Sequence, residues 1–302
     1  MTGRFGSVLT AMVTPFDEDG RLDLDAAAAL ARWLVEHGSD GLVVAGTTGE
    51  SPTMTDDEKL SLFRAVTEAV TVPVIAGTGS NDTRHTVELT QKAASLGAAG
   101  ILIVTPYYNR PSQAGLEGHF RAAAAATDLP VMLYDIPIRT GRKIAHATLL
   151  RLLGDVPNIV AVKDAANDMA ASARLVAEAP AGFELYSGND DVTLPLLSIG
   201  AVGLVGVATH WAGELCSEMV ASFFKGDVEA ARLINARLLP SFAFESTESA
   251  PNPIPTKAML RVLGLRVGPG RPPMDVEPPE LEQQARALLA DLGIDGRVQP
   301  HG

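Results

Sequence analysis

The residue best suited to chemistry is Lys163, because it ends an apolar run of strand length, Asn-Ile-Val-Ala-Val-Lys-Asp over 158–164. A run of this composition is typical of a parallel strand that is buried on both faces. Burying an ammonium group without a partner costs several kcal/mol unless its pKa falls and the amine becomes neutral. A neutral amine is a nucleophile that can form an imine with a carbonyl compound. The alternative is a solvated lysine that pairs with Asp164 in water.

Phenols and a guanidinium follow other apolar runs. The four tyrosines of the chain, Tyr107, Tyr108, Tyr134 and Tyr186, each lie near the end of such a run, and Arg139 comes soon after the third of them. In α/β folds, ligands bind outside the carboxyl ends of parallel strands. The pattern therefore predicts that these groups surround one mouth. Of the six lysines, only Lys163 lies on a strand-like run. This position favours an imine-forming amine over a solvated lysine.

The elements that must position these residues alternate regularly. Eight strand-like runs are each followed by a helical stretch, which is the count for a closed (β/α)₈ barrel, or TIM barrel. A doubly wound open sheet is the runner-up, but no Gly-x-Gly-x-x-Gly follows the first run and no Walker motif occurs. The expected strands are Val8–Val13, Gly41–Ala45, Val72–Ala76, Gly100–Val104, Val131–Tyr134, Ile159–Lys163, Phe183–Tyr186 and Gly203–Val207. The expected helices are Asp23–His37, Asp56–Val70, Thr83–Leu96, Ser112–Thr127, His146–Leu153, Asp168–Ala179, Asp190–Ile199 and Trp211–Phe224.

Helix starts are expected at four residues whose side chains can accept hydrogen bonds from the free N–H groups of a first turn: Thr55, Asp82, Ser112 and Asn189. After about Gly226 no further strand is expected, only helices at Asp227–Phe244, Thr256–Leu263 and Pro279–Leu292. We therefore expect residues 1–225 to form a catalytic barrel and residues 226–302 a helical extension packed on it.

Composition excludes several classes of partner. Hydrophobic residues make up 46% of the 302 residues and charged residues 20%, which is typical of a soluble globular protein. A formal charge of −12 argues against nucleic acid or an anionic membrane as a partner. A single cysteine fits a reducing compartment, and neither a secretory signal nor a membrane-spanning apolar run is evident. The expected location is the cytoplasm.

The sequence offers few residue patterns for other kinds of catalysis. The six histidines are scattered without metal-ligand spacing, so we expect no metal site. No Gly-x-Ser-x-Gly elbow is present, and Cys216, on an apolar helical stretch, is expected to be a core residue. What remains is an amine nucleophile that works without a metal or a bound cofactor.

Five motifs in order resemble the dihydrodipicolinate synthase family, one of the pyruvate-dependent Schiff-base lyases, which include N-acetylneuraminate lyase. The resemblance runs from about Gly6 to the last helix. The motifs are Gly46-Thr47-Thr48-Gly49-Glu50-Ser51, Thr105-Pro106-Tyr107-Tyr108-Asn109-Arg110-Pro111, Tyr134-Asp135-Ile136-Pro137-Ile138-Arg139-Thr140-Gly141, Val162-Lys163-Asp164 and Pro251-Asn252-Pro253-Ile254-Pro255.

The resemblance implies a reaction and a catalytic set. Lys163 would form the imine with pyruvate, which then condenses with L-aspartate 4-semialdehyde to give 4-hydroxy-tetrahydrodipicolinate, the first committed step of the diaminopimelate route to lysine. Tyr134 would carry protons, in a relay with Thr47 and Tyr108. Tyr108 would cross a dimer interface into the neighbour's site, in a homotetramer built from two tight dimers.

The same resemblance implies the residues that bind substrate. Thr48 and the N–H groups of its turn would hold the pyruvate carboxylate. Arg139 would meet the carboxylate of the second substrate through a bidentate fork. The backbone carbonyl of Val205 would face the catalytic lysine, and Gly188 would line the mouth. Taken singly, Tyr134 is open to another interpretation as a core tyrosine, and Arg139 as a loop arginine paired with Asp135.

The sequence departs from the family at positions that bind inhibitory lysine in its feedback-inhibited members. Two histidines and a glutamate of those members correspond here to Asp56, Lys59 and His85. Lys59 would repel a lysine ammonium group and His85 removes an acceptor, so we expect weak or absent inhibition by lysine.

Two other functions stay open on sequence grounds. One is a related pyruvate aldolase that acts on a sugar acid or a hydroxy-oxo acid. The other is a catalytically inactive barrel that binds a ligand. The inactive barrel would be expected to have lost a relay residue, whereas Thr47, Tyr108, Tyr134 and Lys163 are all present.

Overall fold

Eight short strands pair in chain order, all parallel, and β8 closes the barrel by pairing with β1. The computed structural model describes residues 3–294. The strands are β1 (Val8–Ala11), β2 (Gly41–Val44), β3 (Val74–Gly77), β4 (Gly100–Val104), β5 (Val131–Asp135), β6 (Ile159–Asp164), β7 (Glu184–Ser187) and β8 (Gly203–Gly206). The predicted (β/α)₈ barrel is therefore confirmed, and the open sheet considered as its runner-up is wrong.

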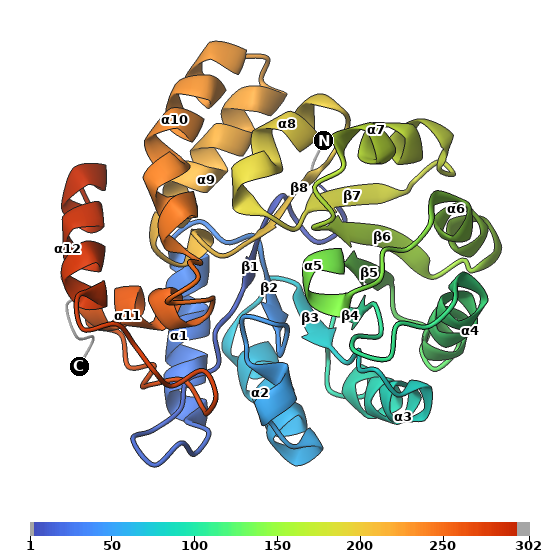
Figure 1. Cartoon of the computed structure of the whole chain (residues 1–302), viewed down its shortest axis with the longest axis horizontal. Coiled ribbons are helices and arrows are strands. Elements are labelled where there is room, and N and C mark those ends of the chain that lie inside the picture. The colour runs from blue at the N-terminus through green and yellow to red at the C-terminus, as the bar shows by residue number, and fades with distance from the viewer. Residues whose placement is uncertain (1–2, 295–302) are drawn as a thin grey trace.

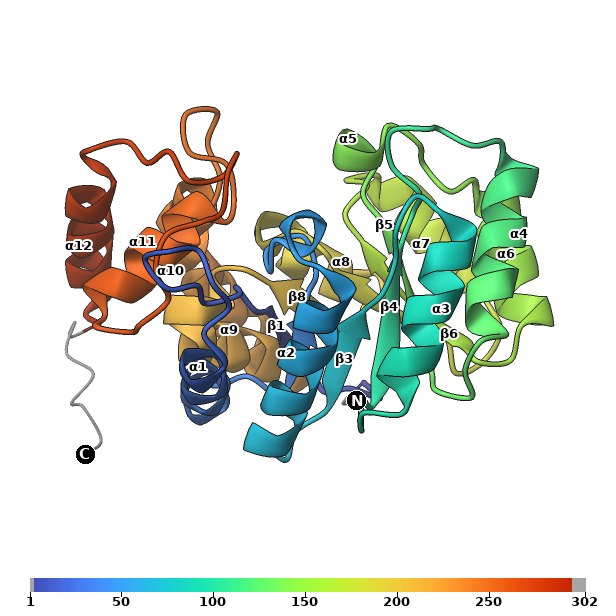
Figure 2. The same cartoon turned by 90° about the horizontal axis from the view of Figure 1, so that it is seen from below.

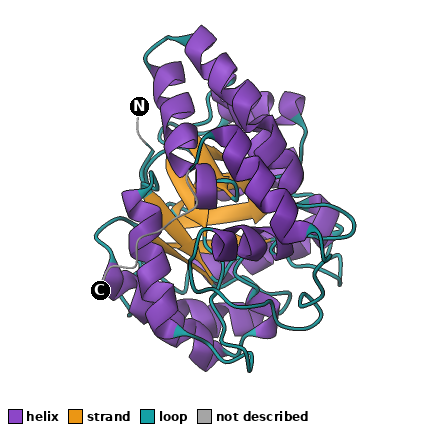
Figure 3. Ribbon diagram, turned by 90° about the vertical axis from the view of Figure 1, so that its left-hand side faces the viewer, coloured by secondary structure: helices purple, strands orange, loops and turns teal. Residues whose placement is uncertain are grey.

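Helices surround the strands on all sides (Figures 1 and 3). The barrel helices are α1 (Leu24–Glu36), α2 (Asp56–Ala69), α3 (Thr83–Ala94), α4 (Gln113–Ala124), α6 (His146–Asp155), α7 (Met169–Glu178), α8 (Thr193–Ser198) and α9 (Thr209–Phe224). Each expected helix is present, although α8 is preceded by the short 3-10 helix η2 (Asp190–Val192). The sequence did not predict α5 (Pro137–Thr140) or the 3-10 helix η1 (Ser51–Thr53), and both stand at the strand ends where the site forms.

Three of the four expected caps are confirmed. The side chains of Thr55, Asp82 and Ser112 each accept a hydrogen bond from a backbone N–H group in the first turn of their helix. The prediction for Asn189 is wrong. Its side-chain amide donates to Asn167 Oδ1 at 2.6 Å, because the two loops after β6 and β7 meet there.

The chain beyond the barrel is helical, with α10 (Val228–Phe244), α11 (Ile254–Val262) and α12 (Leu281–Leu292). Figures 1 and 2 show these helices together on one side of the barrel, where α10 packs along α9 and α11 against α12. Residues 295–302 of the expected extension lie outside the described residues, and the division at 225/226 stays a prediction. None of the described helices is long and apolar enough to cross a membrane.

Strand side chains alternate between the barrel interior and the helices, as the pleat requires. On β5, Val131 and Leu133 pack outward, while Met132 and Tyr134 join the interior cluster. On β6, Val162 packs outward. The alternation therefore turns Tyr134 of β5 and Lys163 of β6 toward the same interior.

A register irregularity places these two residues side by side. Val131 pairs with Ile159, but Met132 pairs with Ala161, so β6 gains one residue relative to β5. As a result, Tyr134 pairs with Lys163. With regular pairing from Val131 onward, Tyr134 would face the outward-pointing Val162 instead. The bulge is therefore what brings the phenol and the amine together, as bulges near active sites commonly do.

Candidate active site

Lys163 is the penultimate residue of β6 and lies inside the barrel with only 5% of its surface exposed. The pKa of its amine is lowered to about 8, chiefly by burial; the Arg139 charge acts in the same direction, whereas the carboxylates of Asp190 and Glu245 oppose the shift. Asp164, the partner in the solvated alternative, points outward and accepts hydrogen bonds from the Ser172 hydroxyl and a loop N–H group. The solvated alternative is therefore wrong, and the amine has the environment of a nucleophile.

Tyr134 lies beside this amine. The Lys163 nitrogen is 4.3 Å from the centroid of the Tyr134 ring. The Thr47 side chain lies near the phenol hydroxyl. Burial raises the pKa of Tyr134 to about 12, although the Arg139 charge and the nearby Thr47 hydroxyl act against the shift. The phenol thus keeps its proton near neutral pH and can donate it to a group bound at the amine.

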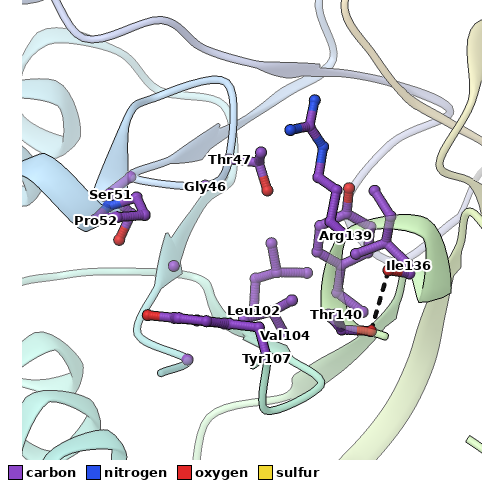
Figure 4. A pocket seen from close by; sticks show the side chains of 14 residues that line it. Gly46, Thr47, Ser51, Pro52, Leu102, Val104, Tyr107, Ile136, Arg139 and Thr140 are labelled. Atoms are coloured by element: carbon purple, nitrogen blue, oxygen red, sulfur yellow. Dashed lines mark hydrogen bonds between the residues drawn. The ribbon is translucent and has the colours of Figure 1, made fainter. Parts of the chain in front are cut away.

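A cavity of about 210 Å³ opens in front of Tyr134 at the strand ends. Figure 4 shows Thr47 and Arg139 reaching toward this space from the loop after β2 and from α5, with Tyr107 along another side. Ser51 and Pro52, from η1, complete the wall on the β2 side. The cavity therefore has a hydroxyl, phenols and a guanidinium around a largely apolar floor, which suits a small anionic ligand.

Arg139 is free to meet a ligand. It lies on α5, where Thr140 Oγ1 donates to the Ile136 carbonyl and fixes the short helix (dashed line in Figure 4). The alternative partner, Asp135, is buried instead and accepts a hydrogen bond from the Ile144 N–H at 3.2 Å. Burial raises the pKa of Asp135 to about 7, so near neutral pH it carries only part of a full charge. Within residues 3–294, no salt bridge involves Arg139.

The other predicted binding residues lie around the cavity rather than on its wall. Thr48 is buried in the turn after β2 and accepts a hydrogen bond from Asn252 at 2.9 Å. Val205 is fully buried on β8 in the same interior cluster as Tyr134. Gly188 donates its N–H to the Asp164 carbonyl at 2.7 Å, close to the Ala165 side chain.

The tyrosines divide into three groups. Tyr134 and Tyr107 line the cavity. Tyr108 does not, because its backbone is left-handed, with φ of 71°, and its surface is 90% exposed. The expectation that Tyr186 joins the mouth is wrong, since its hydroxyl donates to the Gly6 carbonyl at 3.1 Å among the N-terminal residues. Its side chain leans along β7 toward the opposite end of the barrel.

The prediction that Tyr107 lies at the mouth is confirmed, whereas sequence reasoning missed the role of Ser51 and Pro52 in the wall, although Ser51 lies in a motif that was recognised. Their positions depend on the path of the loops after β2 and β4. The interpretation of Cys216 is confirmed, because it is fully buried and burial raises the pKa of its thiol. Among the described residues, no three His, Cys, Asp or Glu side chains are grouped to hold a metal ion.

Known proteins resemble this chain over nearly its whole length. Residues 4–292 match the model of the dihydrodipicolinate synthetase family. The chain is 56% identical to the 4-hydroxy-tetrahydrodipicolinate synthase of Acidothermus cellulolyticus, over 96% of this chain and 93% of that protein. It is 50% identical to the enzyme of the same name from Moorella thermoacetica, over 96% of this chain and 99% of that one. The crystal structure of DHDPS from Cyanidioschyzon merolae with lysine bound superposes with a TM-score of 0.94 at 45% identity, covering 97% of this chain and 100% of that one.

The lowered pKa of Lys163 predicts how its reactivity depends on pH. Since only the neutral amine reacts and its pKa is about 8, acetylation by brief pulses of acetic anhydride should rise about tenfold per pH unit below 8 and level off above it. The measurement is mass spectrometry of digests from pH 6 to 10, with Lys92, exposed on α3, as reference. A profile for Lys163 that follows Lys92 over the whole range would contradict the assignment.

Proposed function

The chain belongs to the dihydrodipicolinate synthetase family, and from this premise we propose that it condenses pyruvate with L-aspartate 4-semialdehyde through an imine on Lys163. The product is 4-hydroxy-tetrahydrodipicolinate, the first committed intermediate of the diaminopimelate route to lysine. The observation that carries the proposal is the buried amine of Lys163, which pairs in register with Tyr134 at the strand end. A single desolvated amine beside a proton donor is what imine chemistry needs.

The reaction begins with attack of the Lys163 amine on the keto carbon of pyruvate. Tyr134 donates a proton to the departing oxygen, which leaves as water, and the imine forms. Tyr134, now deprotonated, takes a methyl proton to give an enamine, which attacks the aldehyde carbon of the second substrate, and Tyr134 then gives that proton to the aldehyde oxygen, which becomes a hydroxyl group. The amino group of that substrate closes the ring on the imine carbon and releases Lys163 as a free amine. One water is lost overall, and no redox step is involved.

The neighbouring groups divide the remaining tasks. Thr47, which lies near the phenol hydroxyl of Tyr134, passes the proton along the relay. Thr48 and the N–H groups of its turn hold the pyruvate carboxylate, while Arg139 binds the carboxylate of the aldehyde substrate. The Val205 carbonyl faces the reacting amine, and Gly188 keeps the mouth open between the loops after β6 and β7.

A second copy of the chain completes this site. Tyr108 and Ile138 are each 90% exposed near the mouth, an unusual position for an aromatic and a large aliphatic side chain. In a tight dimer they are covered, and the phenol of Tyr108 enters the partner's relay. We place two such dimers in a homotetramer in the cytoplasm, with residues 1–225 as the catalytic barrel and 226–302 as the packed extension.

Trapping with pyruvate and borohydride tests the imine directly. Reduction should irreversibly attach a pyruvyl group to the peptide that contains Lys163, and Lys163→Met should abolish the label. The peptide with Lys257, an equally buried lysine, serves as the internal control and should stay unlabelled. Labelling of another lysine, or of none, would refute the mechanism. Turnover with a sugar acid and none with aspartate semialdehyde would favour the related aldolase instead.

Tyr134→Phe should reduce turnover by about 10²-fold or more, because it removes the proton carrier and leaves the ring packing intact. Tyr186→Phe is the matched control, since Tyr186 is also a register partner of Lys163 but directs its hydroxyl to the other end of the barrel. Its turnover should stay within threefold of wild type. A loss below threefold for Tyr134→Phe, from steady-state assays of both variants, would remove it from this role.

We also expect lysine to inhibit weakly or not at all. His85 Nε2 lies 2.8 Å from Asp56 Oδ1, so these two groups are engaged with each other. Lys59 is buried beside them, and burial lowers the pKa of its amine. Initial rates measured with added lysine should stay near the uninhibited value. Half-inhibition at submillimolar lysine would show that this surface still accepts the amino acid.

A further inference from the structure

The Pro251–Pro255 motif reaches the turn after β2, some two hundred residues away in sequence. Asn252 Nδ2 donates to Thr48 Oγ1 at 2.9 Å, across a separation of 204 residues. Thr256, in the first turn of α11, donates its hydroxyl to Asn252 Oδ1 at 3.2 Å. All three side chains are buried. The amide of Asn252 is thus held between two hydroxyl groups with its NH₂ end toward Thr48.

This arrangement determines what the Thr48 hydroxyl can do. Because its oxygen already accepts the hydrogen bond from Asn252, its own hydrogen must point elsewhere. Within residues 3–294, that hydrogen has no protein acceptor at hydrogen-bond distance. A buried O–H group without an acceptor is costly, and an anionic ligand removes the cost. Asn252 therefore makes Thr48 a hydrogen-bond donor.

The C-terminal extension also contacts the turn after β2 at Glu50. Glu50, whose backbone is left-handed with φ of 56°, forms an ion pair with Lys257 at 2.7 Å. The second Glu50 oxygen accepts the N–H of Arg271 at 2.8 Å. Lys257 also donates to the Pro269 carbonyl at 2.8 Å and is fully buried. The extension thus holds the turn on both sides of Gly49, so the Thr48 hydroxyl cannot relax by moving its backbone.

We propose that Asn252 is a positioning residue for pyruvate binding, which orients the Thr48 hydroxyl as a fixed donor to the carboxylate of the keto acid. The inference rests on the proposed function, because it takes pyruvate as the ligand. It gives the C-terminal extension a specific task in the reaction, since the barrel alone does not supply this amide. Asn252 acts through Thr48 and need not touch the reacting atoms.

The test measures pyruvate saturation in Asn252→Ala, Thr48→Val and the double variant. Asn252→Ala should raise the half-saturating pyruvate concentration for borohydride trapping, and the KM for pyruvate, by about tenfold. Its kcat should stay within threefold, and its KM for aspartate semialdehyde should not change. In the Thr48→Val background, Asn252→Ala should add less than twofold, because both variants remove the same interaction. Gln284→Ala, exposed on α12, is the control for a change elsewhere in the extension.

Thr256→Val keeps Asn252 but removes the group that orients its amide, and it serves if Asn252→Ala folds poorly. It should raise the half-saturating pyruvate concentration by a few fold, whereas Thr256→Ser should restore the wild-type value. Multiplicative effects in the double variant, or a lowered Tm with unchanged pyruvate saturation, would overturn the proposal. Absence of trapping in the wild type would instead overturn the proposed function, and this inference with it.

Discussion

The structure depends on keeping one amine out of water. Lys163 gains no hydrogen bond or ion pair within residues 3–294 that would offset its burial, and its nearest aromatic neighbour is the Tyr134 ring. Burial therefore moves its pKa toward neutrality. The barrel tolerates this cost because the amine lies at the end of a strand, where the interior opens into the cavity, and not in the middle of the packed layers. The cost to folding stability leaves an amine of which a larger fraction is neutral near pH 7 than in a solvated lysine.

The charges around this amine balance each other instead of pairing with it. Asp190 and Glu245 both accept the N–H of Ala208, at 3.2 and 3.1 Å, which brings two buried carboxyl groups together. Burial raises the pKa of Asp190 to about 6 and raises that of Glu245 as well, so the two do not hold two full charges near neutral pH. Their residual charge favours the ammonium form of Lys163, whereas Arg139 favours the amine. An ammonium held by a full carboxylate would be a structural ion pair and a poor nucleophile.

The sequence patterns predicted the barrel and which chemical groups follow its strands, but not the direction in which every side chain points. The strand order and the inward position of Lys163 follow from alternation and from apolar runs of strand length. Tyr186 obeys the same alternation, yet its hydroxyl bonds near Gly6, because a long inward side chain can lean toward either end of the barrel. Which end it chooses depends on N-terminal backbone that no local pattern describes. The bulge that aligns Tyr134 with Lys163 was also invisible, since it is a relation between two strands. The short helix α5 could not be predicted, because four residues are too few to show a helical period.

Lys163 and Lys257 show why burial alone does not identify a nucleophile. Both nitrogens lie 4.3 Å from an aromatic centroid, Tyr134 or Phe16, and burial lowers the pKa of each to about 8. Lys257, however, has Glu50 at 2.7 Å and donates to a backbone carbonyl at 2.8 Å, so the carboxylate favours its ammonium form, which has no lone pair for attack, and its removal would leave Glu50 buried alone. Lys163 is not itself a lining residue of the cavity, but its amine lies against the ring of Tyr134, which lines it. The same residue type, buried in both places, is therefore suited to anchor the fold where a carboxylate satisfies it and to the proposed role of nucleophile where no group does.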